Sequence, residues 1–197
     1  DDIVTGGAGA DVIDGGAGDD TLIGGAGADS IEGGAGTDVA DYSDAGAGVT
    51  VYLDGTAGSG SDAAGDTLSG VETLRGSAYA DVLHGSTGAD TLFGQAGDDT
   101  LEGRAGADVL VGGDGFDTAD YSASAAGVTI NLATGTGIGG DAEGDTLTTI
   151  ERVTGSANAD TLTGSSSADT LEGNDGNDVI DGGAGADTLL GGAGDDT

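Results

Sequence analysis

The chain has 197 residues, and its 37 acidic side chains against 3 basic ones give a formal charge of -34. This acidity excludes nucleic acid as a partner, because its phosphates would be repelled. No apolar run approaches the roughly 20 residues that a spanning helix needs, so we predict no membrane insertion. With 3% aromatic residues and no cysteine, so acidic a chain would ordinarily be disordered. A folded state therefore requires an additional source of cohesion.

The first array, residues 1–41, repeats a nine-residue pattern. It reads GGAGADVID, GGAGDDTLI and GGAGADSIE over residues 6–32, with a fourth copy at 33–41 and a truncated copy before them. Gly comes first in each full copy, Asp sixth and usually a branched apolar residue eighth. A period of nine fits neither a helix nor simple alternation, so each unit is predicted to be a turn followed by a very short strand. One unit buries almost nothing, so the copies can fold only as a stack.

A different segment, the connector at residues 42–75, follows the first array and returns at 121–154. The two copies align without gaps, and the same alignment extends to the flanking arrays, where Asp2 corresponds to Asp81. One array and one connector therefore form a longer unit, which we call the super-repeat. A connector is close in length to two pairs of nonapeptides, so we expect it to continue the stack with wider loops.

Each connector is predicted to contain two strands. Val49, Val51 and Leu53 alternate with polar residues, as in a half-buried strand. A second strand is predicted around residues 68–74, and around 147–153 in the second copy.

Several connector residues also recur from one super-repeat to the next. We expect Tyr42 and Tyr121 to be packing residues rather than ligand platforms. The recurrent acids either cap strands or bind a further ion, and the sequence does not separate these alternatives. These acids are Asp62, Asp66, Glu72, Asp141, Asp145 and Glu151.

Two further arrays occupy residues 76–120 and 155–197, so the expected organisation is one continuous solenoid over 1–197. The eighth position is Ala40 at the end of the first array and Ala119 at the end of the second. Departures from the fourth-position Gly cluster after each connector. Ion sites in those loops are doubtful, because Tyr and Ser tolerate left-handed backbone angles poorly. The residues concerned are Tyr79, Asn158 and Ser167.

The nine-residue unit has the chemistry of a cation site. Glycines at positions one, two and four allow left-handed angles that aim successive carbonyls at one point. The sixth-position Asp adds a carboxylate, and an oxygen-only donor set without sulfur or imidazole is the preference of Ca²⁺. The predicted side-chain ligands are Asp2, Asp11, Asp20, Asp29, Asp38, Asp81, Asp90, Asp99, Asp108, Asp117, Asp160, Asp169, Asp178, Asp187 and Asp196. The predicted backbone-carbonyl ligands are Gly7, Gly9, Gly16, Gly18, Gly25, Gly27, Gly88, Gly97, Gly106, Gly115, Gly176, Gly183 and Gly185.

Apart from the connector acids, the other polar residues are predicted to be neither ligands nor catalytic groups. The fifth-position acids Asp1, Asp19, Asp98 and Asp195 neighbour a ligand and are predicted to be surface charge. His84 is the only histidine and is expected to point outward. One histidine builds neither a zinc site nor a catalytic triad, and no HExxH motif occurs, so we predict no catalytic residues and no enzymatic activity.

The units resemble the GGxGxDxUx nonapeptide of RTX (repeats-in-toxin) haemolysin-type calcium-binding proteins. The resemblance implies an all-β fold: an elongated right-handed parallel β-roll, or β-solenoid, with two nonapeptides per coil. It also implies several Ca²⁺ ions in columns between turns, each held by Asp carboxylates of units n and n+2 and by backbone carbonyls of both loops.

The resemblance further implies a secreted bacterial protein that leaves the cell unfolded by type I secretion and folds on Ca²⁺ outside. The exact super-repeat favours an extracellular structural region, namely a spacer, stalk or lattice element of a large adhesin, surface-layer or filament protein. The alternatives are an accessory region of a secreted metalloprotease or polysaccharide epimerase, and a ligand-binding adhesin segment. Calcium ions are the expected partners. Exposed coil ends invite stacking, end to end or laterally, but the sequence leaves self-association open.

Overall fold

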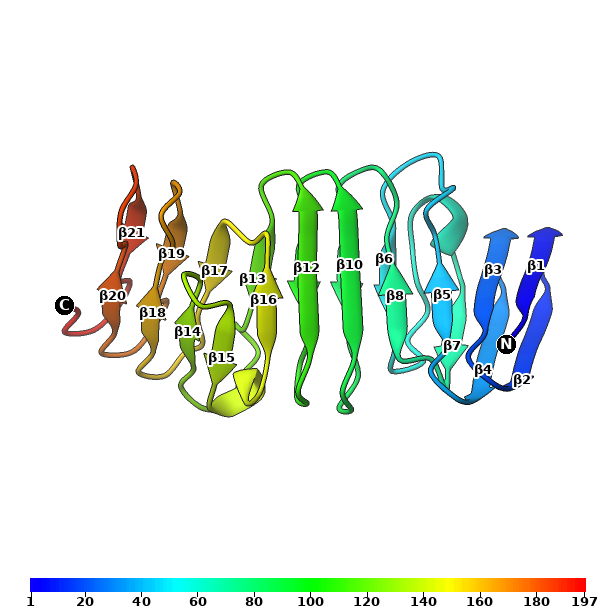
Figure 1. The fold of residues 1–197 in the computed structure, drawn as a ribbon, viewed down its shortest axis with the longest axis horizontal. Helices are drawn as coiled ribbons and strands as arrows, with labels where there is room; N and C mark the ends of the chain where they lie inside the picture. The colour runs from blue at the N-terminus through cyan, green and yellow to red at the C-terminus, as the bar shows by residue number, and fades with distance from the viewer.

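The computed structural model describes residues 1–197 as a nearly all-β chain of 21 short strands and two 3₁₀ turns. Most strand pairs are parallel, and a strand in an array pairs with the strand two nonapeptides further along the chain, as in Ile3 with Thr21. Two nonapeptides therefore make one coil, which confirms the predicted parallel β-roll. The coils follow one another along the longest axis of the molecule (Figure 1). No helix has the length and apolar character needed to span a membrane.

The strands follow the arrays and connectors in order. The first array holds β1 (Ile3–Ala8), β2 (Val12–Ala17), β3 (Thr21–Ala26), β4 (Ser30–Ala35) and β5 (Val39–Asp41), and the first connector holds β6 (Thr50–Tyr52), η1 (Ser61–Ala63), β7 (Thr67–Ser69) and β8 (Thr73–Arg75). The second array holds β9 (Val82–His84), β10 (Thr91–Ala96), β11 (Thr100–Glu102), β12 (Val109–Asp114) and β13 (Thr118–Asp120). The second connector holds β14 (Thr129–Asn131), β15 (Thr136–Ile138), η2 (Gly140–Ala142), β16 (Thr146–Thr148) and β17 (Arg152–Thr154), and the third array holds β18 (Thr161–Thr163), β19 (Thr170–Glu172), β20 (Val179–Asp181) and β21 (Thr188–Leu190).

The roll has two faces, and the chain passes from one to the other at almost every loop. One face is an 11-stranded sheet in the order β1-β3-β5-β8-β10-β12-β16-β15-β14-β18-β20. The other face is formed by a 7-stranded sheet, β21-β19-β17-β13-β11-β9-β6, and a 3-stranded sheet, β2-β4-β7. Each loop of an array therefore lies at one of the two edges where the faces meet.

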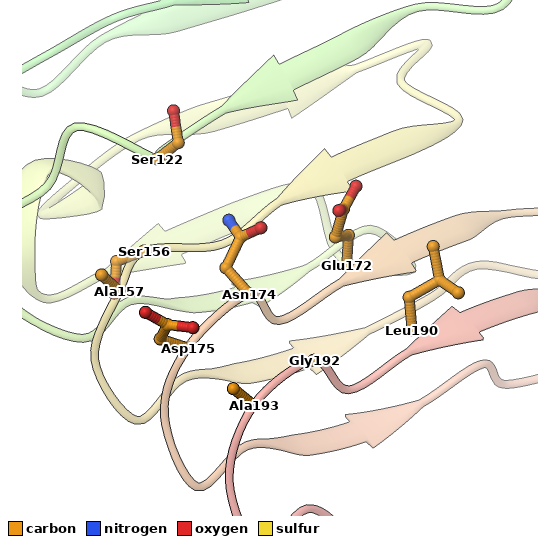
Figure 2. A pocket seen from close by; sticks show the side chains of 9 residues that line it. All are labelled: Ser122, Ser156, Ala157, Glu172, Asn174, Asp175, Leu190, Gly192 and Ala193. Carbon is orange, nitrogen blue, oxygen red and sulfur yellow. The ribbon is translucent and has the colours of Figure 1, made fainter.

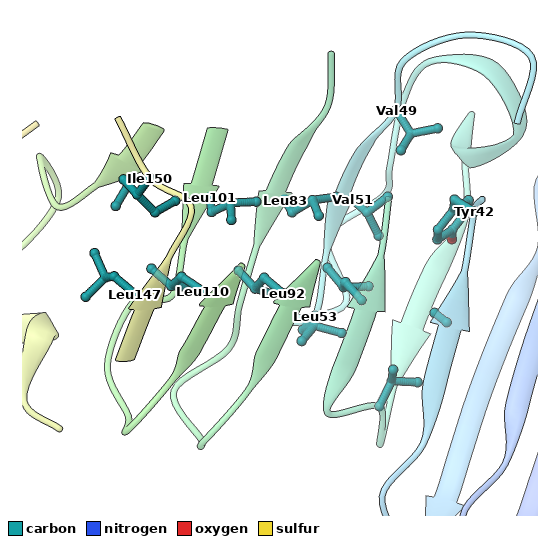
Figure 3. Packing of buried hydrophobic residues seen from close by; sticks show 14 of the residues in the cluster. Tyr42, Val49, Val51, Leu53, Leu83, Leu92, Leu101, Leu110, Leu147 and Ile150 are labelled. Carbon is teal, nitrogen blue, oxygen red and sulfur yellow. The ribbon is translucent and has the colours of Figure 1, made fainter. Parts of the chain in front are cut away.

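The core is built from the eighth position of each unit. In a three-residue strand only the middle side chain points inward, since side chains alternate between faces. Leu92 and Leu110 pair on one face and Leu83 and Leu101 on the other, and all four are fully buried. These rows of leucines lie opposite each other across a thin interior (Figure 3). One contiguous cluster of 27 buried apolar residues runs through the roll.

The connectors differ from two ordinary coils. Val49, Val51 and Leu53 are buried around β6, as predicted. The single second strand predicted around residues 68–74 is wrong: the structure has β7 and β8 on opposite faces, because Gly70, at φ 58°, turns the chain between them. Thr149, at φ 51°, does the same between β16 and β17.

The second connector also inserts an antiparallel strand. β15 lies between β14 and β16 and pairs antiparallel with both. In the first connector the matching segment forms only an isolated bridge between Thr50 and Ser59. Each connector thus widens one face of the roll and adds one strand, β8 or β17, to the other.

Equivalent elements lie on opposite faces in successive super-repeats. β5 and β8 belong to the 11-stranded sheet, whereas their counterparts one super-repeat later, β13 and β17, belong to the 7-stranded sheet. The chain crosses between faces an odd number of times per super-repeat, so each super-repeat is turned by half a revolution. Accordingly, η1 and η2 lie at opposite edges of the roll in Figure 1.

Because the interior is so thin, one leucine should contribute strongly to stability. We expect Leu101→Ala to lower the free energy of unfolding by about 2 to 5 kcal/mol, since Leu101 is fully buried between Leu83 and Ala119. Denaturant unfolding in saturating CaCl₂, followed by circular dichroism, measures the change. Val109→Ala is the control, because Val109 is 38% exposed; an equal loss in both variants would contradict this view of the core.

Candidate metal sites

The sixth-position aspartates form ladders of carboxylates inside the roll. All but Asp196 lie at the end of a loop, directly before a strand, and 11 of the 15 are buried. One carboxylate oxygen accepts the backbone N–H of the aspartate one coil earlier, as when Asp99 Oδ1 accepts from Asp81 N at 2.8 Å and Asp117 Oδ1 from Asp99 N at 2.9 Å. This bond links consecutive coils at their edges.

The ladders continue into the connectors through four of the acids whose role the sequence left open. Asp66 Oδ1 accepts from Asp29 N at 2.8 Å, and Glu72 Oε2 accepts from Asp38 N at 3.0 Å. Asp145 and Glu151 do the same for Asp108 and Asp117. The recurrence of these acids in both copies of the connector was the only sign in the sequence that they have a role. Asp62 and Asp141, by contrast, lie in the 3₁₀ turns and do not join a ladder.

The ladders lie at two edges of the roll, because each coil has two loops. Hydrogen bonds define separate runs at each edge. One edge holds Asp11-Asp29-Asp66, Asp81-Asp99-Asp117-Glu151 and Asp169-Asp187. The other holds Asp2-Asp20-Asp38-Glu72, Asp90-Asp108-Asp145 and Asp160-Asp178-Asp196.

The second oxygen of many ladder aspartates is buried and has no hydrogen-bond partner. An unpartnered buried carboxylate is costly unless a cation balances it. The donor set therefore fits a hard cation, which would supply the missing positive charge. The Oδ2 atoms concerned are those of Asp11, Asp20, Asp29, Asp38, Asp99, Asp108, Asp117 and Asp178.

Backbone carbonyls of successive loops stack beside these carboxylates. A Cβ added at Gly25 would lie 2.1 Å from the Gly7 carbonyl oxygen, and one at Gly27 only 1.8 Å from that of Gly9. No group of three or more Asp, Glu, His or Cys side chains forms a metal site by itself. An ion would thus be held by ladder aspartates together with carbonyls such as these.

The loops with unpartnered carboxylates share a left-handed backbone. Gly7 and Gly9, at positions two and four, have φ of 109° and 119°. Three units place a larger residue at position two and still keep positive φ: Gln95 at 81°, Arg104 at 66° and Asn174 at 71°. The turn therefore persists without glycine at this position, a tolerance that sequence reasoning missed.

Four other loops, which we call the Ser loops, have serine at position two and a different arrangement. In the first, Ser77 donates its N–H to Asp81 Oδ2 at 2.6 Å and its hydroxyl to Asp81 Oδ1 at 2.8 Å. The serines of these loops do not adopt positive φ. The doubtful residues Tyr79, Asn158 and Ser167 all fall in these loops, but the serine was not recognised as the shared signal. The Ser loops are 76–81, 85–90, 155–160 and 164–169.

Sequence comparison agrees with this geometry. The profile of the RTX calcium-binding nonapeptide repeat (4 copies) matches residues 5–40, 14–48, 66–101, 84–119, 147–178 and 163–197, well over half of the chain. The chain belongs to the RTX calcium-binding nonapeptide repeat family. Comparison with curated proteins gives no match. The RTX matches leave out residues 49–65 and 120–146, where the connectors widen one face of the roll.

Burial changes the acidity of the RTX ladder. It raises the pKa of Asp99 to about 7, with the charges of Asp81 and Asp117 adding to the effect. Burial likewise raises the pKa of Asp108 to about 7, helped by the charges of Asp145 and Asp90. Without a counter-charge, these carboxylates hold protons more tightly than exposed aspartates do.

Two tyrosines satisfy the connector aspartates of the RTX ladder. Tyr42 donates its hydroxyl to Asp66 Oδ2 at 3.0 Å, and Tyr121 donates to Asp145 Oδ2 at 2.9 Å. Both tyrosines are buried. Each therefore packs, as predicted, and also provides a donor where the ladder ends.

The remaining polar residues lie outside the ladders. The fifth-position acids are exposed, and Asp19 and Asp98 each accept one backbone N–H from the next coil. His84 lies on the outer side of β9, stacked on Tyr52 at 4.4 Å between ring centroids and paired with Glu102. All three arginines pair with acids: Arg75 with Asp41, Arg104 with Asp54 and Arg152 with Glu172.

Removing one tyrosine hydroxyl tests the end of the ladder. We expect Tyr121→Phe to lower the free energy of unfolding by about 1 to 3 kcal/mol, because Asp145 Oδ2 would become a buried acceptor without a donor. Denaturant unfolding measures the loss. Tyr52→Phe is the matched control, since the Tyr52 hydroxyl makes no hydrogen bond; comparable losses would contradict the role assigned to Tyr121.

The raised pKa values predict that the metal-free roll is more stable in mild acid. Asp99 and Asp108 have ordinary pKa values of 3.8 and folded-state values of about 7. Their contribution is therefore fully present below the ordinary pKa and is lost as the pH rises through about 7. Circular dichroism of chain stripped of metal should show more β structure at about pH 5 than at about pH 8. A larger β signal at the higher pH would contradict this.

Proposed function

We propose that this RTX region is an extracellular, calcium-dependent structural solenoid that folds when it binds several Ca²⁺ ions. The observation that carries the proposal is the set of eight buried aspartate oxygens without a hydrogen-bond partner. A formal charge of -34 opposes folding of the metal-free chain. Cations at the ladders would remove this repulsion and join neighbouring coils, so their binding free energy would become folding free energy.

A structural role rather than catalysis is supported by the uses of the acidic residues. The ladder carboxylates accept hydrogen bonds between coils and, on this proposal, bind metal. Exposed fifth-position acids also bond to the next coil. We therefore propose no enzymatic activity for this region. The super-repeat adds length to the roll without adding a new kind of site, which favours a spacer, stalk, surface-layer or filament element.

Location outside a bacterial cell is supported by the same physics. Cytosolic calcium is scarce, so the chain would stay unfolded during secretion and fold on meeting extracellular Ca²⁺. Secretion is also typical of RTX repeats. The roll would then need no disulfide, and the chain contains no cysteine.

Calcium titration with a matched pair of variants tests the proposal. We expect the β signal of the wild type in circular dichroism to be lost in EGTA and to return in millimolar CaCl₂. Asp99→Asn should raise the calcium concentration needed for half-maximal folding several-fold, because Asp99 Oδ2 is one of the unpartnered oxygens. Asp98→Asn removes the same charge from the exposed neighbouring residue and should change the midpoint little. A wild-type β signal that chelation leaves unchanged would refute calcium-driven folding.

A further inference from the structure

Each serine hydroxyl of the four Ser loops both donates and accepts a hydrogen bond. Each donates to the carboxylate of its own loop and accepts the backbone N–H of the fourth residue. Ser86 Oγ, for example, donates to Asp90 Oδ2 at 2.9 Å and accepts from Gly88 N at 3.0 Å. Ser86 N donates to the same Oδ2 at 2.6 Å. No aspartate of a Ser loop has an unpartnered buried oxygen.

In four of the other loops the fourth residue, Gly9, Gly18, Gly97 or Gly176, donates its N–H to the next coil instead. Gly97 N donates to the Asp114 carbonyl at 2.9 Å, and Gly176 N donates to the Ala193 carbonyl at 2.9 Å. The φ values of these two glycines are 125° and 141°. Gly88 could adopt the same angles but does not, because its N–H is directed to Ser86. The serine at position two, rather than a missing glycine at position four, therefore accompanies the altered loop.

One edge of the third array shows both arrangements side by side. The loops that carry Ser156, Asn174 and Gly192 stack in successive coils (Figure 2). Asn174 Nδ2 donates to the Gly155 carbonyl at 2.7 Å, so a first-position carbonyl of this Ser loop already has a partner. Asp178, in the Asn174 loop, keeps an unpartnered Oδ2, whereas Asp160, in the Ser loop, does not.

We propose that the Ser loops bind no calcium, because the serine hydroxyl and N–H provide internally the positive partner that an ion provides elsewhere. The inference rests on the proposed function and refines it by assigning loops with and without ions. Asp81, Asp90, Asp160 and Asp169 are then structural members of the ladders. The calcium sites are confined to the loops that have left-handed backbone at positions two and four.

The positions of the Ser loops give this assignment a consequence. All four ladder runs that begin after a connector begin with a Ser loop: those starting at Asp81, Asp90, Asp160 and Asp169. Runs that end at Asp66 or Asp145 end on a carboxylate whose second oxygen is bonded to tyrosine. The ions are therefore grouped in three blocks, one per array, with connectors and Ser loops between them.

Counting bound calcium in variants tests the inference. Ser86→Gly restores the GGxGxD pattern over residues 85–90, since Gly85, Gly88 and Asp90 are already present. We expect this variant to bind one more Ca²⁺ per chain than the wild type at saturation, measured by equilibrium dialysis with elemental analysis of calcium. Ser43→Gly is the control for added flexibility, because Ser43 is exposed and belongs to no ladder; its count should equal that of the wild type.

The reverse substitution keeps the test decisive if Ser86→Gly fails to fold. Gly16→Ser introduces serine at position two of the loop that carries Asp20. An added Cβ meets no atom within 4 Å there, but the φ of 92° is unfavourable for serine, so we expect this loop to take the backbone of the Ser loops. This variant should bind one Ca²⁺ fewer than the wild type. If Ser86→Gly folds and binds the same number of Ca²⁺ ions as the wild type, the inference is overturned. If Ser86→Gly does not fold, an unchanged number of bound ions in Gly16→Ser overturns it. A wild type that binds no calcium would instead refute the proposed function.

Discussion

The structure depends on carboxylates that are buried at the edges of a very thin roll. Within each run, one oxygen of every aspartate after the first accepts the backbone N–H of the aspartate in the preceding coil, which sets the spacing and register of the loops. The other oxygen needs a positive partner, because a desolvated carboxylate without one strongly opposes folding. The leucine rows provide apolar burial but cannot offset this electrostatic cost. Neutralisation of the ladder is therefore the condition on which the packing of the coils depends.

The chain satisfies that condition in more than one way. In eight loops the buried second oxygen has no partner from the protein, and calcium, which repeats of this family bind, would supply the counter-charge. At Asp66 and Asp145 a buried tyrosine hydroxyl is the partner. In the Ser loops it is the second-position serine. Tyrosine follows the first and second arrays and serine begins the second and third, where a connector interrupts the regular stacking of glycine loops.

The connectors show how a repetitive fold accommodates an irregular segment. β7 and β8 continue opposite faces of the roll, so the ladders resume beyond the connector at both edges. The additional strand β15 is accommodated on one face alone. Because the super-repeat is turned by half a revolution, successive connectors widen opposite faces, so the distortions alternate along the roll.

Much of the fold and of the candidate metal sites could be predicted from the sequence by local chemistry. The nine-residue period, the inward eighth residue and the sixth-position aspartates follow from glycine freedom, side-chain alternation and the preference of hard cations for oxygen, and each depends on neighbouring residues alone. The sequence did not reveal that Asp66 and Glu72 continue the ladders, that Tyr42 bonds to Asp66, or that Ser86 replaces the donor that other loops lack. These partners are brought together by the stacking of coils that are distant in the sequence, and the turn at Gly70 decides which face receives each connector strand. Contacts across coils depend on the register of the whole roll, so only the tertiary structure could decide them.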